Sequence, residues 1–202
     1  MTKLKLTYFD FPGGRVEPAR LALAIGGIEF EDYRFPFSEF ADVRATTPLG
    51  QVPTLHVNDQ QITQCNAINR YVAKLTDLYP KDDFQALVCD EVMDAVEDIM
   101  NKIVATFGMQ GDELKSAREA LVEGPLSKYL KWCASRLETQ GGEFFADNRL
   151  TFVDLKLMVW VSSLNSGKLD HIPADLVARV APSLNAHSQL VANTPAIVKY
   201  YA

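Results

Sequence analysis

Tyr8 is the first residue of the sequence whose type and position suggest chemistry. It ends an alternating run, residues 3–8, and precedes a turn over residues 11–14 (FPGG). A tyrosine hydroxyl can donate a hydrogen bond to a bound thiolate, and a donor to the charged form lowers the pKa of a thiol. Lowering that pKa from about 8.5 to about 6.5 takes roughly 2.7 kcal/mol of differential stabilisation. The alternative interpretation of Tyr8 is an ordinary, half-buried strand residue.

Residues 47–71 form a second stretch that suggests ligand binding. Val52-Pro53 begins an extended segment, where a proline cannot donate a ladder hydrogen bond and where a cis peptide bond is a candidate. Gln64 and Cys65 then lead a helix, whose first turn offers unpaired backbone N–H groups and a partial positive charge to an anion. An exposed backbone edge beside an anion site predicts the binding of a short, extended peptide that ends in a carboxylate.

Two further positions could support such a ligand. Arg15 begins the helix after the turn, so its guanidinium could stabilise a thiolate electrostatically or orient Tyr8. Phe40 and Arg44 lie four residues apart in a short loop helix and could flank a carboxylate. For each of these side chains, a solvated surface position is the alternative interpretation.

The elements that must position these residues alternate between strand and helix patterns up to about residue 78. Strands are predicted over residues 3–8, 28–35 and 54–57, with a further short strand after the turn at Asn58-Asp59. Helices are predicted from Arg15, weakly within residues 36–46, and from Gln64. The resulting order, β-α-β-α-β-β-α, implies a mixed sheet whose first strands are parallel. It is the order of the thioredoxin-like fold. No Cys-x-x-Cys is present, so dithiol exchange is not expected.

The rest of the chain predicts helices. Long helical patterns cover residues 86–107, 116–139 and 150–164, and the second is broken near Gly124-Pro125. Shorter helices are expected after Pro173, after Pro182 and at Thr194-Pro195.

Local sequence signals predict where one helix begins and where the boundary between two domains lies. Thr151 and Asp154 are spaced for a capping box, whose cap contributes about 0.5–2 kcal/mol. Residues 77–84 are polar and contain a proline, which marks a linker. We therefore predict a thioredoxin-like domain at residues 1–79, a linker at 80–85, and an all-α domain at 86–202.

Composition excludes several classes of protein. The chain has 202 residues, 48% of them hydrophobic, which is enough for a sizeable core, and its formal net charge is -6. A mildly acidic chain without basic runs is a poor candidate for binding nucleic acid or anionic membranes. No apolar run approaches about 18 residues, so no transmembrane helix is expected, and the N-terminus does not resemble a signal peptide.

Cysteine and histidine usage bears on compartment and on metal binding. Cys65, Cys89 and Cys133 are odd in number and widely spaced, which indicates reduced thiols in a cytoplasmic protein. Cys89 and Cys133 are expected to be buried, small hydrophobic residues. The histidines have no metal-ligand spacing, so no metal site is expected; they are His56, His171 and His187.

Several separated motifs carry a resemblance to a known family. LGQVP and TQCNAINRYVA resemble the glutathione-binding segment of the cytosolic glutathione transferases, which reads roughly Gly-Gln-Leu/Val-Pro and then Gln-Ser-Xaa-Ala-Ile. LTYFDFPGGRVEPARL resembles the corresponding segment of the sigma class, which includes haematopoietic prostaglandin D synthases and invertebrate enzymes. The resemblance covers nearly the whole chain. It implies a thioredoxin-like domain followed by an all-α domain, glutathione as co-substrate and a homodimer.

The resemblance also implies site residues. Tyr8 would activate the thiol and Arg15 would assist it. Glutathione would be bound by Tyr8, Phe40, Arg44, Gln51, Val52, Pro53, Gln64, Cys65 and, from the partner subunit, Asp98. Cys65 stands where the family usually has serine, and a thiol is a weaker hydrogen-bond donor. We therefore expect weakened or altered recognition of the γ-glutamyl group.

The second substrate, an electrophile, is expected to bind between facing elements. Lys156 and Trp160 are four residues apart and share one helix face, although a tryptophan at helical spacing is more often part of the core. The residues predicted for this site are Phe9, Gly14, Met100, Phe107, Lys156 and Trp160.

Three functions fit the resemblance. The expected one is conjugation of glutathione to small hydrophobic electrophiles, the chemistry of detoxification. The second is glutathione-dependent isomerisation of an endoperoxide, as in prostaglandin D synthase. The third is a non-catalytic, crystallin-like or ligand-carrying relative. The presence of Tyr8, Gln51, Pro53 and Gln64 argues against this third function.

Overall fold

Four strands build one mixed sheet in the N-terminal half of this computed structural model, which describes residues 2–202. The strands are β1 (Leu4–Phe9), β2 (Glu31–Phe35), β3 (Thr54–Val57) and β4 (Gln60–Ile62), in the spatial order β2-β1-β3-β4. β1 pairs parallel to β2 and antiparallel to β3. A parallel pair needs a crossover connection, and α1 (Glu17–Ile25) supplies it.

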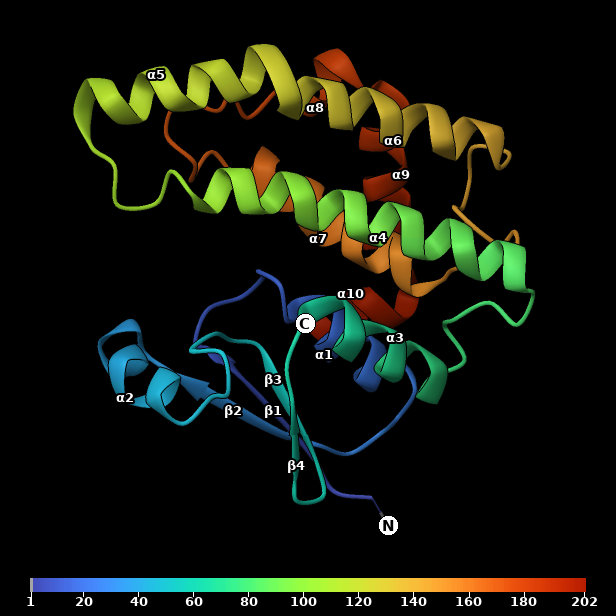
Figure 1. Cartoon of the computed structure of the whole chain (residues 1–202). Coiled ribbons are helices and arrows are strands. Elements are labelled where there is room, and N and C mark those ends of the chain that lie inside the picture. The colour runs from blue at the N-terminus through green and yellow to red at the C-terminus, as the bar shows by residue number, and fades with distance from the viewer. Residues whose placement is uncertain (1) are drawn as a thin grey trace.

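Two helices cover the face of this sheet that is turned toward the helical half. Figure 1 shows α1 and α3 (Cys65–Leu75) between the sheet and the longer helices. Because α1 packs against both α3 and α7, all of its residues from Glu17 to Leu23 are buried. The predicted β-α-β-α-β-β-α order is confirmed, with a 3-10 turn (Phe37–Glu39) and α2 (Phe40–Ala45) as its second, short helical part.

Local geometry shifts two of the predicted boundaries. The first helix begins at Glu17 and not at Arg15, because the turn after β1 continues through Gly13 and Gly14, which have φ values of +94° and +73°. The second strand begins at Glu31 and not at Ile28, because the N–H of Ile28 closes the end of α1 by bonding to Leu23 O at 3.0 Å. The Val52–Pro53 peptide, which the sequence marked as a candidate for the cis form, is cis.

The C-terminal half consists of helices, and all four strands of the described residues 2–202 lie in the N-terminal half. Its first three long helices are α4 (Asp83–Val104), α5 (Gly111–Leu121) and α6 (Ser127–Thr139). α5 and α6 are separated by a π-helical turn (Val122–Leu126), inside which Gly124 leaves helical geometry. The break predicted at Gly124-Pro125 is therefore confirmed. The remaining helices are α7 (Phe152–Asn165), α8 (Leu176–Val180), α9 (Pro182–Ala192) and α10 (Pro195–Tyr201).

α7 is the buried centre of the helical half, and its start is as predicted. Thr151 and Asp154 form the capping box, in which Thr151 N–H donates to the Asp154 carboxylate at 2.7 Å. The same carboxylate accepts from the Thr151 hydroxyl at 2.7 Å and from Phe145 N–H at 3.1 Å, and it contacts His187 Nε2 at 2.9 Å. Four groups thus converge on one fully buried acid, which anchors the start of α7.

The thioredoxin-like sheet domain and the helical bundle together confirm the predicted fold class. The two halves contact each other directly, since Phe152 N–H at the start of α7 donates to Leu78 O, after the end of α3, at 2.8 Å. The division at residues 80–85 stays a prediction. Among residues 2–202, no helix has the length and apolar character needed to cross a membrane.

Candidate active site

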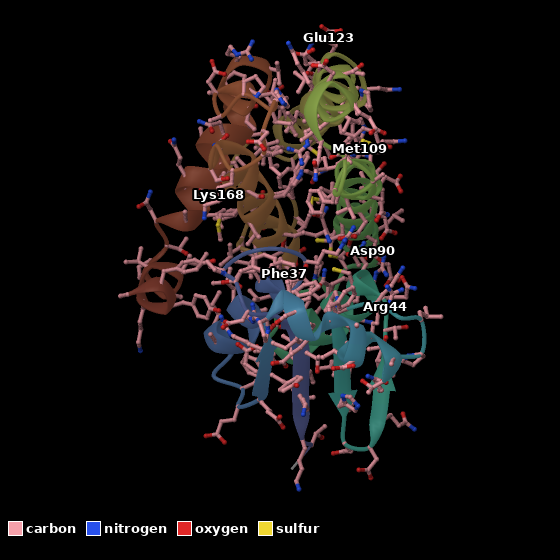
Figure 2. All side chains as sticks on the ribbon, turned by 90° about the vertical axis from the view of Figure 1, so that its left-hand side faces the viewer. Phe37, Arg44, Asp90, Met109, Glu123 and Lys168 are labelled. Carbon is pink, nitrogen blue, oxygen red and sulfur yellow. The ribbon has the colours of Figure 1, made fainter. Side chains whose placement is uncertain are left out.

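A cavity of about 1630 Å³ lies between the two halves of the molecule. Small-ligand pockets are commonly about 300–1,000 Å³, so this one has room for two substrates. Figure 2 shows Phe37 on the thioredoxin-like half and Lys168 on the helical half, and both residues line the cavity. The predicted site residues that line it are Tyr8, Phe9, Gly14, Arg15, Phe40, Gln51, Val52, Pro53, Gln64, Cys65, Asp98, Met100 and Phe107.

Three predicted site residues do not line this cavity. The Arg44 guanidinium lies 5.5 Å from the centre of the Phe40 ring, just outside the cavity. Lys156 and Trp160 are buried, with exposures of 4% and 3%. The helix face that they share points into the protein, whereas their neighbours Met158 and Val159 face the cavity.

Tyr8 lies at the end of β1 with only 6% of its surface exposed. Burial raises the pKa of its hydroxyl above the ordinary value of 10.0. The hydroxyl therefore keeps its proton at neutral pH and can donate a hydrogen bond to an anion. The backbone N–H of Arg15 donates to the same oxygen at 3.4 Å. A Cβ at Gly14 would lie 3.0 Å from the Tyr8 hydroxyl, so only glycine leaves this approach open.

The side chain of Arg15 belongs to a group of three charges, the ion cluster of Arg15, Glu97 and Lys156. Arg15 Nε lies 2.9 Å from one oxygen of Glu97, and Lys156 Nζ lies 2.6 Å from the other. Burial would raise the pKa of Glu97, but the charges and hydrogen bonds of Lys156 and Arg15 outweigh it and lower that pKa. Because its guanidinium is already paired, Arg15 contacts Tyr8 through its backbone, which favours an orienting role.

Cys65 lies at the start of α3, beside the ion cluster. Its thiol is 3.4 Å from Arg15 O and 3.9 Å from Lys156 Nζ. Burial raises the pKa of this thiol to about 11, although the nearby Lys156 charge opposes the shift. Cys65 is therefore a neutral thiol at pH 7 and a weak hydrogen-bond donor, not a nucleophile.

Aromatic rings form one wall of the cavity, which we call the aromatic wall: Phe9, Phe11, Phe37 and Phe40. The centres of the Phe9 and Phe37 rings are 4.5 Å apart, and Phe11 and Phe37 are nearly parallel at 5.8 Å. Sequence reasoning missed Phe11 and Phe37. The phenylalanines at positions 9, 11, 35, 37 and 40 were the available signal, but only the β1–β2 pairing brings the two groups together.

Charged groups on the opposite side of the cavity come mainly from α4. Asp94 pairs with Arg70 of α3 at 3.2 Å. Asp98, one turn further along α4, lines the cavity of its own chain and has no ion pair within residues 2–202. Its predicted contact with a partner subunit's glutathione stays a prediction. In the same described range, no group of three His, Cys, Asp or Glu side chains could hold a metal ion.

The fold defines a class of proteins in which a thioredoxin-like domain is joined to a helical domain and a cavity lies between the two. Comparison with protein families agrees with this. The model described as "Glutathione S-transferase, N-terminal domain" matches residues 4–74, and the one described as "Glutathione S-transferase, C-terminal domain" matches residues 97–202. The chain belongs to the glutathione S-transferase family, whose enzymes use glutathione as co-substrate and bind electrophiles.

Individual relatives match over most of the chain. Glutathione S-transferase 3 of Caenorhabditis elegans is 30% identical, with 87% of this chain and 86% of the relative covered. The structure of prostaglandin synthase D of Nilaparvata lugens has a TM-score of 0.84 at 26% identity, covering 98% of this chain and 96% of that one. The structure of rat hPGDS complexed with a quinoline has a TM-score of 0.84 at 28% identity, with the same coverages.

The ion cluster generates a stability prediction. Glu97→Gln leaves one buried cation, Lys156, and one half-buried cation, Arg15, without their anion, and should lower the free energy of unfolding by roughly 3 kcal/mol at pH 7. The control is Glu91→Gln on the same helix, which breaks an exposed pair with Arg136 and should cost under about 1 kcal/mol. Urea unfolding of both variants tests this.

The difference in stability between wild type and Glu97→Gln should also depend on pH. The pKa of Glu97 is lower in the folded chain than its ordinary value of 4.5, so its stabilising effect is present above that value and is lost as the pH falls through the folded pKa. The difference between wild type and Glu97→Gln should therefore shrink below about pH 4. A difference that is equal at pH 7 and pH 3 would contradict the assignment.

Proposed function

We propose that this enzyme activates the glutathione thiol through the Tyr8 hydroxyl and conjugates it to small hydrophobic electrophiles. The observation that carries the proposal is the position of Tyr8, whose buried hydroxyl lines the same cavity as the cis-proline edge and the start of α3. We also propose that the protein is a cytoplasmic, sigma-class enzyme. Support comes from the segment around Tyr8 and from the likeness to the two prostaglandin synthase structures.

Glutathione is proposed to lie extended along the edge next to Pro53. The backbone of Val52 would pair with the tripeptide in the manner of strand addition, with the Gln51 side chain beside it. The γ-glutamyl carboxylate would lie at the N-terminus of α3, near Gln64. Since the Cys65 thiol is a weak donor, backbone N–H groups and Gln64 would provide most of this binding. Asp98, reaching across from the second copy of the chain, would attract the positively charged amino group.

The glycine end of glutathione would lie toward the short helix α2. Phe40 lines this part of the cavity. Arg44 stands behind the ring of Phe40, where its charge can attract the terminal carboxylate. This placement directs the thiol of the central cysteine toward Tyr8.

The proposed reaction begins when the glutathione thiol loses its proton to solvent. Tyr8 donates a hydrogen bond to the thiolate and so lowers the pKa of the thiol. The sulfur then forms a bond to an electrophilic carbon held against the aromatic wall, with Met100 and Phe107 on the facing side. With an aryl halide, the halide leaves with its bonding electron pair. Holding both reactants in one cavity supplies much of the acceleration.

Replacement of Tyr8 tests this mechanism. In Tyr8→Phe, the thiol pKa of bound glutathione should rise by about 2 units, from about 6.5 to about 8.5, and kcat/KM at pH 6.5 should fall about fiftyfold. Glutathione affinity should stay within a few-fold of wild type, because the hydroxyl acts on the thiolate. Conjugation of an aryl halide across pH and calorimetric titration with glutathione provide the measurements.

A matched control for this variant is Tyr33→Phe, which removes the hydroxyl of an exposed tyrosine on β2. It should leave the pH profile unchanged. Equal activity of Tyr8→Phe and wild type at neutral pH would remove Tyr8 from the mechanism.

The likeness to two prostaglandin synthase structures favours a second candidate function, the isomerisation of an endoperoxide. We expect turnover of a prostaglandin endoperoxide that depends on glutathione without consuming it. Chromatographic analysis of the products, with glutathione measured before and after, decides this. If the endoperoxide decays at the same rate with and without enzyme, the second function is excluded.

We further propose that the protein is a homodimer. Exposed apolar side chains on α3 and on the start of α4 would be covered by the second copy. They are Tyr71, Leu75, Phe84 and Leu87, with exposures of 36%, 43%, 63% and 61%. Asp98 lies on α4 as well, which is compatible with its proposed reach to the partner subunit's glutathione.

Sedimentation equilibrium should give twice the mass of one chain for the wild type. Leu87→Glu should weaken the dimer at least tenfold, because it places a charge in a buried apolar contact. The control is Leu190→Glu, which changes an exposed leucine on α9, away from the proposed dimer surface. This variant should not weaken the dimer. A monomeric wild type would refute the proposal.

A further inference from the structure

One cation in the cavity has no carboxylate partner. Arg15, Arg70 and Lys168 all line the cavity. Arg15 pairs with Glu97, and Arg70 pairs with Asp90 and Asp94. Across residues 2–202, Lys168 forms no ion pair, and its side chain is exposed. A positive charge is therefore available at this point of the cavity wall.

Hydroxyl groups accompany this charge. The cavity-facing side of α7 changes character along the helix, from Met158 and Val159 to Ser162, Ser163 and Ser166. Ser166 is already engaged, since its hydroxyl donates to Ser163 O at 2.7 Å and accepts from Lys168 N–H at 3.2 Å. Ser162 and Ser163 are both exposed residues. The Ser162 hydroxyl donates only to the Met158 sulfur at 3.8 Å, a weak acceptor that an anion can replace, and the Ser163 hydroxyl can donate to an anion as well.

This polar end is separated along α7 from the end of the cavity where glutathione is proposed to bind. Lys156, on the same helix, marks the glutathione end of the cavity, because its ammonium lies 3.9 Å from the Cys65 thiol. At a rise of 1.5 Å per residue, Ser162 lies roughly 9 Å and Ser166 roughly 15 Å further along the helix axis. Figure 2 shows Lys168 on the helical half, above the Phe37 side of the thioredoxin-like half.

The space between the two ends is apolar. Met100 and Val104 of α4 and Phe107 in the turn after α4 line one side, and Met158 and Val159 of α7 line another. Phe107 is 58% exposed although it is a large aromatic residue, so it offers uncovered apolar surface to a ligand. A ligand that fills this space must be apolar in its middle and can be anionic at its far end.

We infer that the second substrate class is a long apolar electrophile that ends in a carboxylate, and that Lys168 with Ser162 and Ser163 binds the carboxylate. The inference rests on the proposed conjugating function. The apolar chain crosses between α4 and α7, which places the electrophilic carbon near the thiolate at Tyr8. For an enone substrate, the sulfur bonds to the β-carbon, and the displaced π-electron pair takes up a proton at the α-carbon.

A lysine after a helix C-terminus also stabilises the helix dipole. That role alone would not distinguish a charged ligand from a neutral one. The test therefore compares an octadecenoic acid carrying an enone in mid-chain with its methyl ester, both below their critical micelle concentrations.

Wild type should favour the acid over the ester by about fivefold in kcat/KM at low salt, a modest factor because Lys168 is exposed. In Lys168→Gln the preference should disappear, with the ester rate unchanged. High salt should have the same effect on wild type.

The control is Lys128→Gln, which removes the charge of an exposed lysine that does not line the cavity and should keep the preference. A preference absent from wild type, or retained in Lys168→Gln, overturns the inference.

A binding measurement separates this inference from the proposed function. Calorimetry with dodecanoate, which cannot react, should show about fivefold weaker binding to Lys168→Gln than to wild type and to Tyr8→Phe. If dodecanoate binding depends on Lys168 but neither the enones nor an aryl halide are conjugated, the proposed function fails and the carboxylate site stands. If the ester is conjugated but neither acid preference nor dodecanoate binding depends on Lys168, the carboxylate site fails alone.

Discussion

The paired carboxylate of Glu97 is the interaction on which the site depends. It connects Arg15, in the turn after β1, with Lys156 of α7, and Lys156 in turn contacts Asn66 at the start of α3 at 2.9 Å. Three separate parts of the chain are thereby held around one anion. Buried charges are tolerated only when all partners are present, so the turn that places the Arg15 N–H on Tyr8 is fixed by the same cluster.

α7 shows how one helix can serve core, cluster and cavity at once. Its start is fixed by Asp154, which satisfies four neighbouring groups without any exposure to solvent. Lys156 then points toward the glutathione side, and Met158 and Val159 face the cavity. Beyond them the helix reaches the surface, where serine replaces apolar residues. The change from buried to exposed along α7 therefore sets the change from apolar to polar along the cavity.

The two halves contribute different chemistry to the cavity. The thioredoxin-like half supplies backbone groups, the α3 N-terminus and Tyr8, which suit a constant peptide ligand. The helical half supplies Met100, Phe107 and the cavity-facing side of α7, which suit an apolar second substrate. The aromatic wall lies where the two meet, since Phe9 follows Tyr8 directly and stacks on Phe37. A change of second substrate can thus be made at Met100, Phe107 and the cavity-facing side of α7 without altering the proposed glutathione contacts.

Local patterns in the sequence determined the element order, the cis-proline turn, the Gly124-Pro125 break and the capping box, because each depends on residues close together in the chain. The residues proposed to bind glutathione could also be named from the sequence, since Tyr8, Gln51 and Gln64 lie near the ends of those elements, and the structure places all three on one cavity. The partners of each helix face were decided by tertiary structure alone. Helical spacing correctly grouped Lys156 with Trp160, but only packing against α3 and α4 turned that face inward and left Lys168, beyond the helix end, facing the cavity. Periodicity determines which side chains share a face, whereas the neighbour that a face meets depends on contacts between distant parts of the chain.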